Sequence, residues 1–231
     1  MRIATTAQMK ELDRIAIEER GIPSLRLMEN AAAAVTRAVL ALPGGVRRVC
    51  VLCGPGNNGG DGIAAARLLL AAGVQVQAWL VGDSGRMTPD ARAMQQRLQA
   101  AGGCLLPFSA QAFTLAAPAP GSGFDAVVDA LFGVGLARPL QGDFLAAVQA
   151  VNASGLPVVS CDIPSGVQGD TGARLGAAVQ AAVTVTFSCA KPGLLQGEGR
   201  ACAGRLLVAD IGIPADVLPP DVPAEGAAAL H

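Results

Sequence analysis

Hydrophobic and polar residues follow two patterns along this chain. Short apolar runs rich in valine recur at residues 48–53, 74–81, 104–108, 124–131, 157–163, 182–187 and 205–209. Runs of this length and composition are typical of buried strands. Segments with a helical pattern separate several of them, at residues 63–70, 89–101, 109–115 and 144–151. Strands that alternate with helices predict an α/β fold, a three-layer αβα arrangement with a Rossmann-like, doubly wound and mainly parallel sheet.

Two more helices are expected ahead of the first strand, within residues 5–42. Thr5 or Thr6 can cap the first helix, and Ser24 can cap the second. Apolar residues recur at helical spacing in both, at Met9, Leu12, Ala16, Met28, Ala32, Val35 and Val39. An amphipathic pair of this kind commonly covers the chain's own sheet. A homodimer contact is the less favoured use of the same helices.

Residues 54–62, GPGNNGGDG, follow the first predicted strand and are expected to form a glycine-rich loop before the helix at 63–70. Such a loop lets backbone N–H groups and a helix N-terminus approach a phosphate. The letters GxGxxG match the dinucleotide-binding pattern, which is weak by itself. Asn57, Asn58 and Asp61 have no role in an ordinary nicotinamide-binding turn, so we interpret them as ligands of a substrate or a cation. The alternative is that these residue types simply favour turns.

Carboxylates also follow two later strands. Asp129 opens DALFGVGLARP at residues 129–139, and Asp162 opens DIPSGVQGDTG at residues 162–172. Ligands of a parallel sheet bind outside the carboxyl ends of its strands, so we expect Asp61, Asp129 and Asp162 to meet at one crevice. Each could separately be a helix cap or a turn residue. Together with the neighbouring glycines they predict a binding site.

Composition narrows the chemistry. The length of 231 residues suits one large α/β domain, and 52% of the residues are hydrophobic. The apolar stretches are interrupted before they reach the length of a membrane-spanning helix. A formal net charge of -1 gives no electrostatic reason to expect nucleic acid. We therefore expect neither a membrane nor a nucleic-acid partner, and the polar first residues predict a cytoplasmic chain.

Few residue types remain for acid–base chemistry. The single histidine is the last residue, His231, and tyrosine is absent, so proton transfer falls to carboxylates, lysine or water. Most of the six cysteines lie in predicted strands, where a free thiol behaves as a small buried hydrophobe. Cys50 and Cys53 have the spacing of a metal or redox pair, but no second pair accompanies them.

Six motifs occur in an order that resembles the NAD(P)H-hydrate epimerase family, which also forms the N-terminal domain of bifunctional NAD(P)H-hydrate repair enzymes. They are LMENAA at 27–32, GPGNNGGDG at 54–62, DALFGVGLARP at 129–139, DIPSGVQGDTG at 162–172, TFSCAKPGLL at 186–195 and DIGIP at 210–214. The resemblance implies an epimerase domain at residues 1–214 and an irregular tail or truncated linker at 215–231.

The same resemblance implies an isomerase that interconverts the R and S epimers of NADHX and NADPHX in nicotinamide nucleotide repair. Substrate contacts would come from Asn57, Asn58, Gly59, Gly60, Asp61, Gly133, Val134, Gly135, Leu136, Ala137, Arg138, Pro139 and Asp162. Asp162 would be the catalytic carboxylate. A potassium ion in each subunit would be held by Asn58, Asp129 and Ser165, whose hard oxygen donors suit such a cation. An ADP- or ATP-dependent NAD(P)H-hydrate dehydratase, fused or separate, is the implied partner.

The mechanism is open at this stage between opening of the ring to an aldehyde and loss of water to an iminium. Either route moves one proton on and off oxygen, which a single carboxylate can do. Lys191, in the AKPG segment, pairs with a carboxylate or supports the fold, and we favour the structural role. Two other functions are weighed: a noncatalytic nucleotide-binding or scaffold module, and an NAD(P)-dependent oxidoreductase. The oxidoreductase is disfavoured because the sequence offers neither a Tyr–Lys pair nor a suitable histidine to assist hydride transfer.

Overall fold

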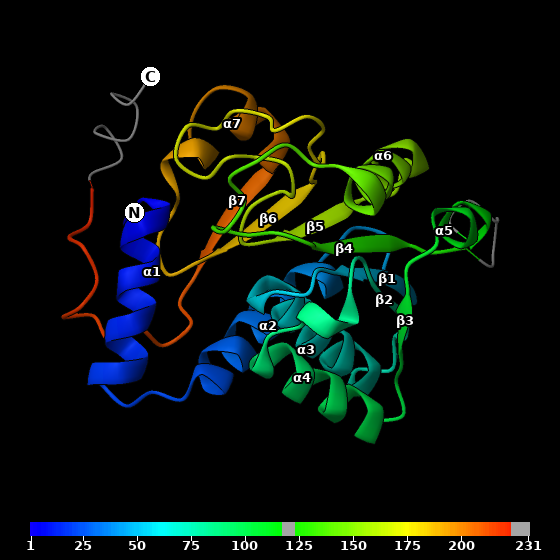
Figure 1. The fold of residues 1–231 in the computed structure, drawn as a ribbon, viewed down its shortest axis with the longest axis horizontal. Coiled ribbons are helices and arrows are strands. Elements are labelled where there is room, and N and C mark those ends of the chain that lie inside the picture. Colours follow the sequence, from blue (N-terminus) through cyan, green and yellow to red (C-terminus); the bar gives the residue numbers. More distant parts are fainter. Residues whose placement is uncertain (117–122, 223–231) are drawn as a thin grey trace.

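A single seven-stranded sheet forms the centre of the protein (Figure 1). The structure is a computed structural model that describes residues 1–116 and 123–222. The strand order is β3-β2-β1-β4-β5-β6-β7, and every neighbouring pair is parallel. The strands are β1 Arg48–Cys53, β2 Gln75–Leu80, β3 Leu105–Pro107, β4 Ala126–Ala130, β5 Val158–Cys161, β6 Val183–Phe187 and β7 Arg205–Ala209. All seven predicted strands and the α/β class are confirmed.

Helices cover both faces of this sheet. They are α1 Thr6–Arg14, α2 Ser24–Leu40, α3 Asn57–Ala71, α4 Pro89–Ala100, α5 Ala110–Ala116, α6 Gly142–Ser154 and α7 Gly197–Ala203. Helices α2, α3 and α4 lie on one face, and α5 and α6 lie on the other (Figure 1). Side chains of β1 alternate accordingly: Val49 and Val51 join the first core, and Cys50 and Leu52 join the second. Helix α7 was not predicted from the sequence.

Two predictions about helix starts are wrong. Ser24 does not cap α2: it is the first helical residue, and Pro23 stands at the N-cap position without a side-chain bond. Thr5 does cap α1, because its side chain accepts from the backbone of Gln8 and its own backbone donates to the Gln8 side chain. Helix α3 begins at Asn57, six residues before the predicted start, so the glycine-rich loop is only residues 54–56.

The glycines inside α3 explain this early start. A Cβ atom on Gly59 would lie 1.8 Å from the carbonyl oxygen of Gly54, and one on Gly60 would lie 2.6 Å from the Met28 side chain. A Cβ atom on Gly62 would lie 2.4 Å from Ala130. The helix therefore presses against its own loop, against α2 and against β4 at once. The absence of side chains at these glycines therefore allows close packing of a helix, and does not mark a long flexible loop.

The strand order determines where a ligand site can form. Strand β1 lies between β2 and β4. The chain therefore adds β2 and β3 on one side of β1, and β4 to β7 on the other side. The carboxyl ends of β1 and β4 flank the crevice that such a reversal creates. The loops after β1, β4 and β5 meet at this edge of the sheet.

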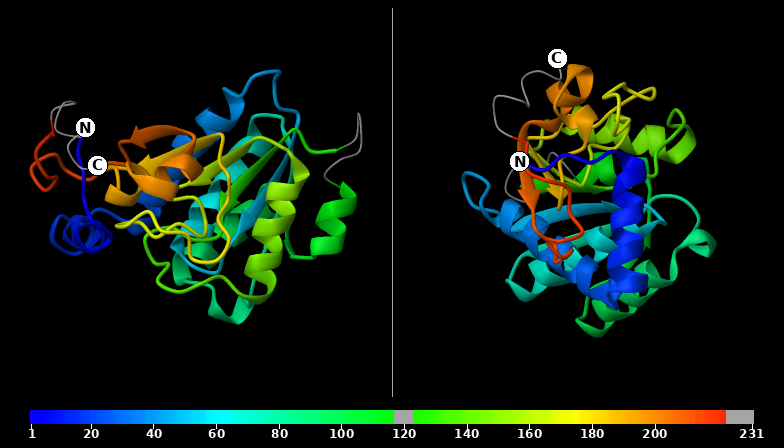
Figure 2. Two further views of the ribbon diagram at one scale, coloured as in Figure 1. Left: turned by 90° about the horizontal axis from the view of Figure 1, so that it is seen from above. Right: turned by 90° about the vertical axis from the view of Figure 1, so that its left-hand side faces the viewer.

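The two ends of the described chain lie together. The backbone nitrogen of Val222 donates to the carbonyl of Met1 at 3.0 Å, and Figures 1 and 2 show the first residues beside the last described segment. Residues 215–222 contain no helix or strand, and the rest of the predicted tail, 223–231, lies outside the described residues. In the described ranges, no helix has the length and apolar character needed to cross a membrane.

Candidate active site

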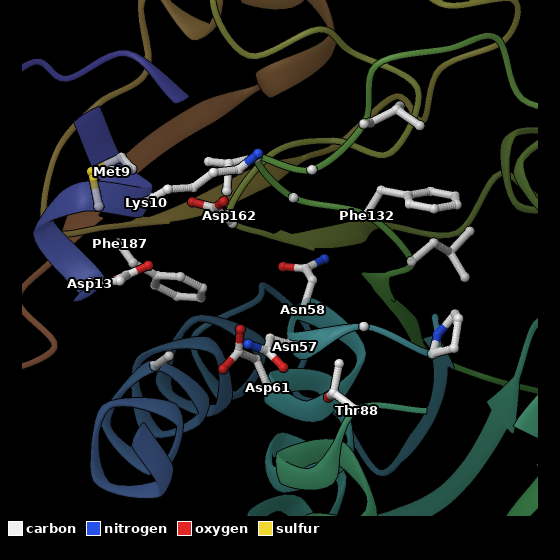
Figure 3. Close-up of a pocket in the computed structure, with 18 of the residues that line it drawn as sticks. Met9, Lys10, Asp13, Asn57, Asn58, Asp61, Thr88, Phe132, Asp162 and Phe187 are labelled. Carbon is white, nitrogen blue, oxygen red and sulfur yellow. The ribbon is translucent and has the colours of Figure 1, made fainter. Parts of the chain in front are cut away.

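A cavity of about 1040 Å³ opens at the carboxyl edge of the sheet, between α1 and the loops after β1, β4 and β5 (Figure 3). Its volume is at the upper end of the usual range for ligand pockets, about 300–1000 Å³. The predicted substrate residues that line it are Asn57, Asn58, Asp61, Gly133, Val134, Gly135, Leu136, Ala137, Arg138, Pro139 and Asp162. Most of the predicted site is therefore brought together around one space.

Four predicted site residues do not line this cavity. Gly59 and Gly60 are buried within α3, where they pack against the loop and α2. Asp129 and Ser165 are also buried, next to each other beneath the cavity. The structure thus separates the predicted residues into a cavity lining and a layer that supports it.

Asp162 directly follows β5 and has a left-handed backbone conformation, with φ of 64°. A residue other than glycine rarely adopts this conformation, and such positions concentrate at functional sites. The Asp162 side chain is buried, and its Oδ1 atom accepts from Lys191 Nζ at 2.5 Å and from Thr186 Oγ1 at 3.2 Å. One carboxylate oxygen is therefore held in place by two donors.

Lys191 is buried, with 1% of its surface exposed. Three hydrogen-bond acceptors surround its ammonium group. Besides Asp162, it donates to Thr186 Oγ1 at 2.9 Å and to the carbonyl of Phe187 at 3.2 Å. All three ammonium hydrogens can be satisfied in this arrangement. Sequence reasoning favoured a purely structural Lys191, and the structure instead pairs it with the predicted catalytic carboxylate.

The second oxygen of Asp162 lies toward the loop after β4. A Cβ atom on Gly133 would lie 2.7 Å from Asp162 Oδ2 and 3.1 Å from Asn58 Oδ1. In the described part of the chain, no hydrogen-bond donor reaches Oδ2. The absence of a side chain at Gly133 leaves the space in which this oxygen can meet a ligand.

Asp129 is the centre of a buried hydrogen-bond cluster beneath the cavity. Its Oδ1 accepts from Ser165 Oγ at 2.6 Å, and its Oδ2 accepts from Ser160 Oγ at 2.8 Å and from the Ser165 backbone at 2.9 Å. Burial raises the pKa of Asp129, and the serine donors oppose that rise. Ser165 Oγ in turn accepts from the Phe132 backbone at 3.0 Å, which ties the cluster to the loop after β4.

The residues of the predicted potassium site fit such an ion chemically. Asp129 and Ser165 place carboxylate and hydroxyl oxygens together, and the Phe132 carbonyl lies 3.5 Å from Ser165 Oγ. Asn58 presents its amide to the same loop, and its buried Nδ2 has no partner among the described residues. As a donor, Nδ2 calls for an acceptor such as a substrate oxygen, whereas Asn58 Oδ1, which lies beside Gly133, is the atom of this amide that could bind a cation. Hard oxygen donors suit potassium and do not favour a soft transition metal.

Two further carboxyl groups face the cavity. Asp61 projects from α3 and Asp13 from α1 (Figure 3). Burial, followed by repulsion from Asp162, raises the pKa of Asp13 to about 6, while Lys191 opposes the rise. Burial also raises the pKa of Asp61 well above its usual value, with added repulsion from Asp162, Asp13 and Asp90. Sequence reasoning missed Asp13, although its spacing of four from Met9 places a carboxylate on the apolar face of α1.

The cysteine pair of β1 does not form a site. Cys50 packs in the core on one face of the sheet and Cys53 in the core on the other, because residues three apart in a strand point to opposite sides. Both side chains are fully buried, and burial raises the pKa of each thiol. The pair therefore lacks the geometry of a shared metal or redox centre.

Comparison with known proteins identifies the family. The family described as YjeF-related protein N-terminus matches residues 24–193. The NAD(P)H-hydrate epimerase of Limosilactobacillus fermentum is 41% identical over 206 residues, which cover 89% of this chain and 95% of that protein. The bifunctional NAD(P)H-hydrate repair enzyme Nnr of Thermofilum pendens is 43% identical over 219 residues, which cover 94% of this chain but 41% of that protein.

A solved structure gives the same fold. The yeast protein YNL200c aligns with a TM-score of 0.80 and covers 97% of both chains, at 24% sequence identity. The motifs and the fold therefore agree with the relatives, and this chain belongs to the YjeF-related protein N-terminus family, as the resemblance of its motifs predicted.

Proposed function

We propose that this protein is an NAD(P)H-hydrate epimerase, an isomerase that interconverts the R and S forms of NADHX and NADPHX. The observation that carries the proposal is Asp162: one oxygen is fixed by Lys191, and the other faces a cavity large enough for most of a dinucleotide. The names of relatives that span the same length support it. An NAD(P)-dependent oxidoreductase is disfavoured because none of the described residues that line the cavity is a histidine or a tyrosine.

The chemistry asks little of the protein beyond proton transfer and orientation. The carbon that inverts carries both a hydroxyl group and the ring nitrogen, so its configuration is lost when either bond opens. Asp162 Oδ2 would carry the proton that either route moves: it would take it from the hydroxyl when the C–N bond opens, or give it to the hydroxyl when the C–O bond breaks. Lys191 would hold the carboxylate in position. Gly133 would leave room for the reacting end of the substrate. Arg138, exposed at the rim of the cavity, would meet the phosphates.

A potassium ion would be held by Asn58, Asp129 and Ser165. Such an ion would supply positive charge next to Asp129 and would hold the loop that carries Phe132 and Gly133. Asp129 is buried and has no basic partner among residues 1–116 and 123–222, which supports this role, because a buried carboxylate is stabilised by a cation.

The partner and compartment follow as further parts of the proposal. The bifunctional relatives in Thermofilum pendens and Moorella thermoacetica are about two and a half times the matched length, so an NAD(P)H-hydrate dehydratase, fused or separate, would act on the S epimer.

Five of the six cysteines are buried, and all six are free thiols. Free thiols suit a reducing compartment, and we place the protein in the cytoplasm.

The proposal is tested by following purified R-NADHX by chromatography until its two epimers equilibrate. The protein should shorten the equilibration time at least a hundredfold relative to buffer, and the effect should be larger in potassium chloride than in sodium chloride. A protein that binds NADHX but leaves the spontaneous rate unchanged would instead be the noncatalytic nucleotide-binding module.

A further inference from the structure

Asp13 is a cavity carboxyl group that the proposed catalytic set does not use. It projects from α1 into the cavity, on the side opposite the loop after β4 (Figure 3). In the described residues, no salt bridge or hydrogen bond engages its carboxylate, in contrast to Asp162. Its neighbours Glu11 and Arg14 on the same helix bond to each other at 2.7 Å instead. The Asp13 carboxylate is therefore available to a ligand.

The position of Asp13 is fixed by contacts that join α1 to the segments of the site. The backbone and hydroxyl of Thr6 both donate to the carboxylate of Asp170 at 2.7 Å. The Ala4 backbone donates to the carbonyl of Ala190 at 3.0 Å, one residue before Lys191. Helix α1 is thus attached to the loop that begins with Asp162 and to the segment that carries Lys191. These contacts hold the N-terminal end of α1, from which Asp13 follows on the same helix, against both segments.

The charges around Asp13 favour a group that exchanges a proton. Asp162 and Asp61 face it from the loop after β5 and from α3, Asp90 lies on α4, and Lys10 is the exposed neighbour on α1. Lys191, the buried cation, is already saturated by its three acceptors. The resulting pKa of Asp13, about 6, is near the pH at which an acid–base catalyst works best.

We propose that Asp13 is a second catalytic carboxyl group, which serves the face of the substrate opposite to Asp162. The inference rests on the proposed epimerase function and deepens it. Epimerisation removes a hydroxyl group from one face of a carbon and restores it on the other. Two carboxyl groups that approach one cavity from different elements provide a proton carrier for each face.

The proton balance of this scheme closes. The protonated carboxyl group on one face gives its proton to the leaving hydroxyl, the C–O bond breaks, and water forms as the ring nitrogen lone pair makes a C=N⁺ bond. Water then adds from the opposite face, and the ionised carboxylate there takes the released proton. One proton has passed between the two carboxyl groups by way of substrate and water, and exchange with solvent restores the starting state. While the C=N⁺ intermediate exists, the carboxyl group that has given up its proton and the ionised carboxylate on the opposite face both stabilise its positive charge.

The test compares Asp13→Asn with Glu11→Gln, a carboxylate-to-amide change on the same helix that leaves the cavity intact. Asp13→Asn should lower kcat at least about a hundredfold in both directions, with ADP-ribose binding unchanged. The rate profile of the wild type should show an inflection near pH 6 that Asp13→Asn loses. Asp13→Glu, which keeps a carboxyl group, should retain part of the rate, and Glu11→Gln should match the wild type.

The outcomes separate this inference from the function on which it rests. A wild-type protein that does not accelerate epimerisation overturns both. An active wild type, with an Asp13→Asn variant of threefold lower rate or less and an unchanged pH profile, overturns only the role of Asp13. Epimerisation in heavy-oxygen water should place one solvent oxygen in the product per inversion, and complete retention of the original oxygen contradicts the water-loss step.

Discussion

The ammonium group of Lys191 lies 2.5 Å from one oxygen of Asp162, and both side chains are buried. Removing one partner of a buried ion pair leaves the other charge without compensation, which costs about 3–5 kcal/mol. Lys191→Met should therefore lower the free energy of unfolding by about that amount and also reduce kcat. Denaturant titration measures the first effect. Lys10→Met, which removes an exposed lysine at the same cavity, should leave stability unchanged; equal losses in the two variants would contradict the pairing.

Two glycines of the loop after β4 form a matched pair. A methyl group at Gly133 would lie 2.7 Å from Asp162 Oδ2, whereas one at Gly135 would meet no atom within 4 Å. Gly133→Ala should reduce kcat at least tenfold because the added methyl displaces the reactive oxygen, and Gly135→Ala should keep the wild-type kcat. Steady-state kinetics of the two variants makes the comparison. A Gly133→Ala variant with wild-type kcat would show that Oδ2 does not need this space.

Ser165 and Ser160 both donate to Asp129, but only Ser165 belongs to the proposed potassium site. Each Ser→Ala change should cost about 1–3 kcal/mol, because a buried carboxylate loses a donor. The wild type should melt at higher temperature in potassium chloride than in sodium chloride of equal concentration. Ser165→Ala should abolish that difference and Ser160→Ala should keep it. If the melting temperature is the same in potassium and sodium chloride for all three proteins, the proposed potassium site is wrong.

Asp13 makes stability depend on pH. Its pKa rises from 3.8 to about 6 on folding, so the folded protein binds more protons than the unfolded chain between these values. The unfavourable contribution is therefore full above about pH 7 and fades as the pH falls toward 4. Asp13→Asn should stabilise the protein by about 1–2 kcal/mol at pH 7.5, after allowance for partial exposure. Unfolding curves at pH 7.5 and pH 4.5 should show this gain shrinking, and a constant gain would contradict the raised pKa.

The sequence predicted strands better than helix starts, and the difference has a physical cause. Apolar runs such as β6, Val183–Phe187, are buried on both faces, so their hydrophobicity alone marks them. The start of α3 was misplaced because Gly59, Gly60 and Gly62 favour a loop when propensity is considered alone. Their function in close packing depends on Gly54, Met28 and Ala130, which are distant in sequence or on other elements. Tertiary contact overrides propensity at this helix.

The candidate site was predictable where its residues follow strands. Asp129 and Asp162 each stand at a strand end, and the topology of a parallel sheet brings such ends together. Lys191 and Asp13 could not be placed in this way. Lys191 reaches Asp162 across 29 positions, and Asp13 depends on how α1 docks through Thr6 and Asp170. The contact between Lys191 and Asp162 leaves no periodic signal in the sequence. The spacing of Asp13 from Met9 shows which face of α1 carries the carboxylate, but not what that face packs against.

The central claim is that Asp162 moves the proton that inverts the substrate carbon. Its most direct test is the rate of R-to-S equilibration of NADHX by Asp162→Asn, measured beside Asp143→Asn, which changes an exposed carboxylate in the first turn of α6. We expect Asp162→Asn to bind ADP-ribose as the wild type does and to lose at least about a hundredfold in kcat, while Asp143→Asn remains fully active. An Asp162→Asn variant that equilibrates the epimers at a near-normal rate would contradict the account.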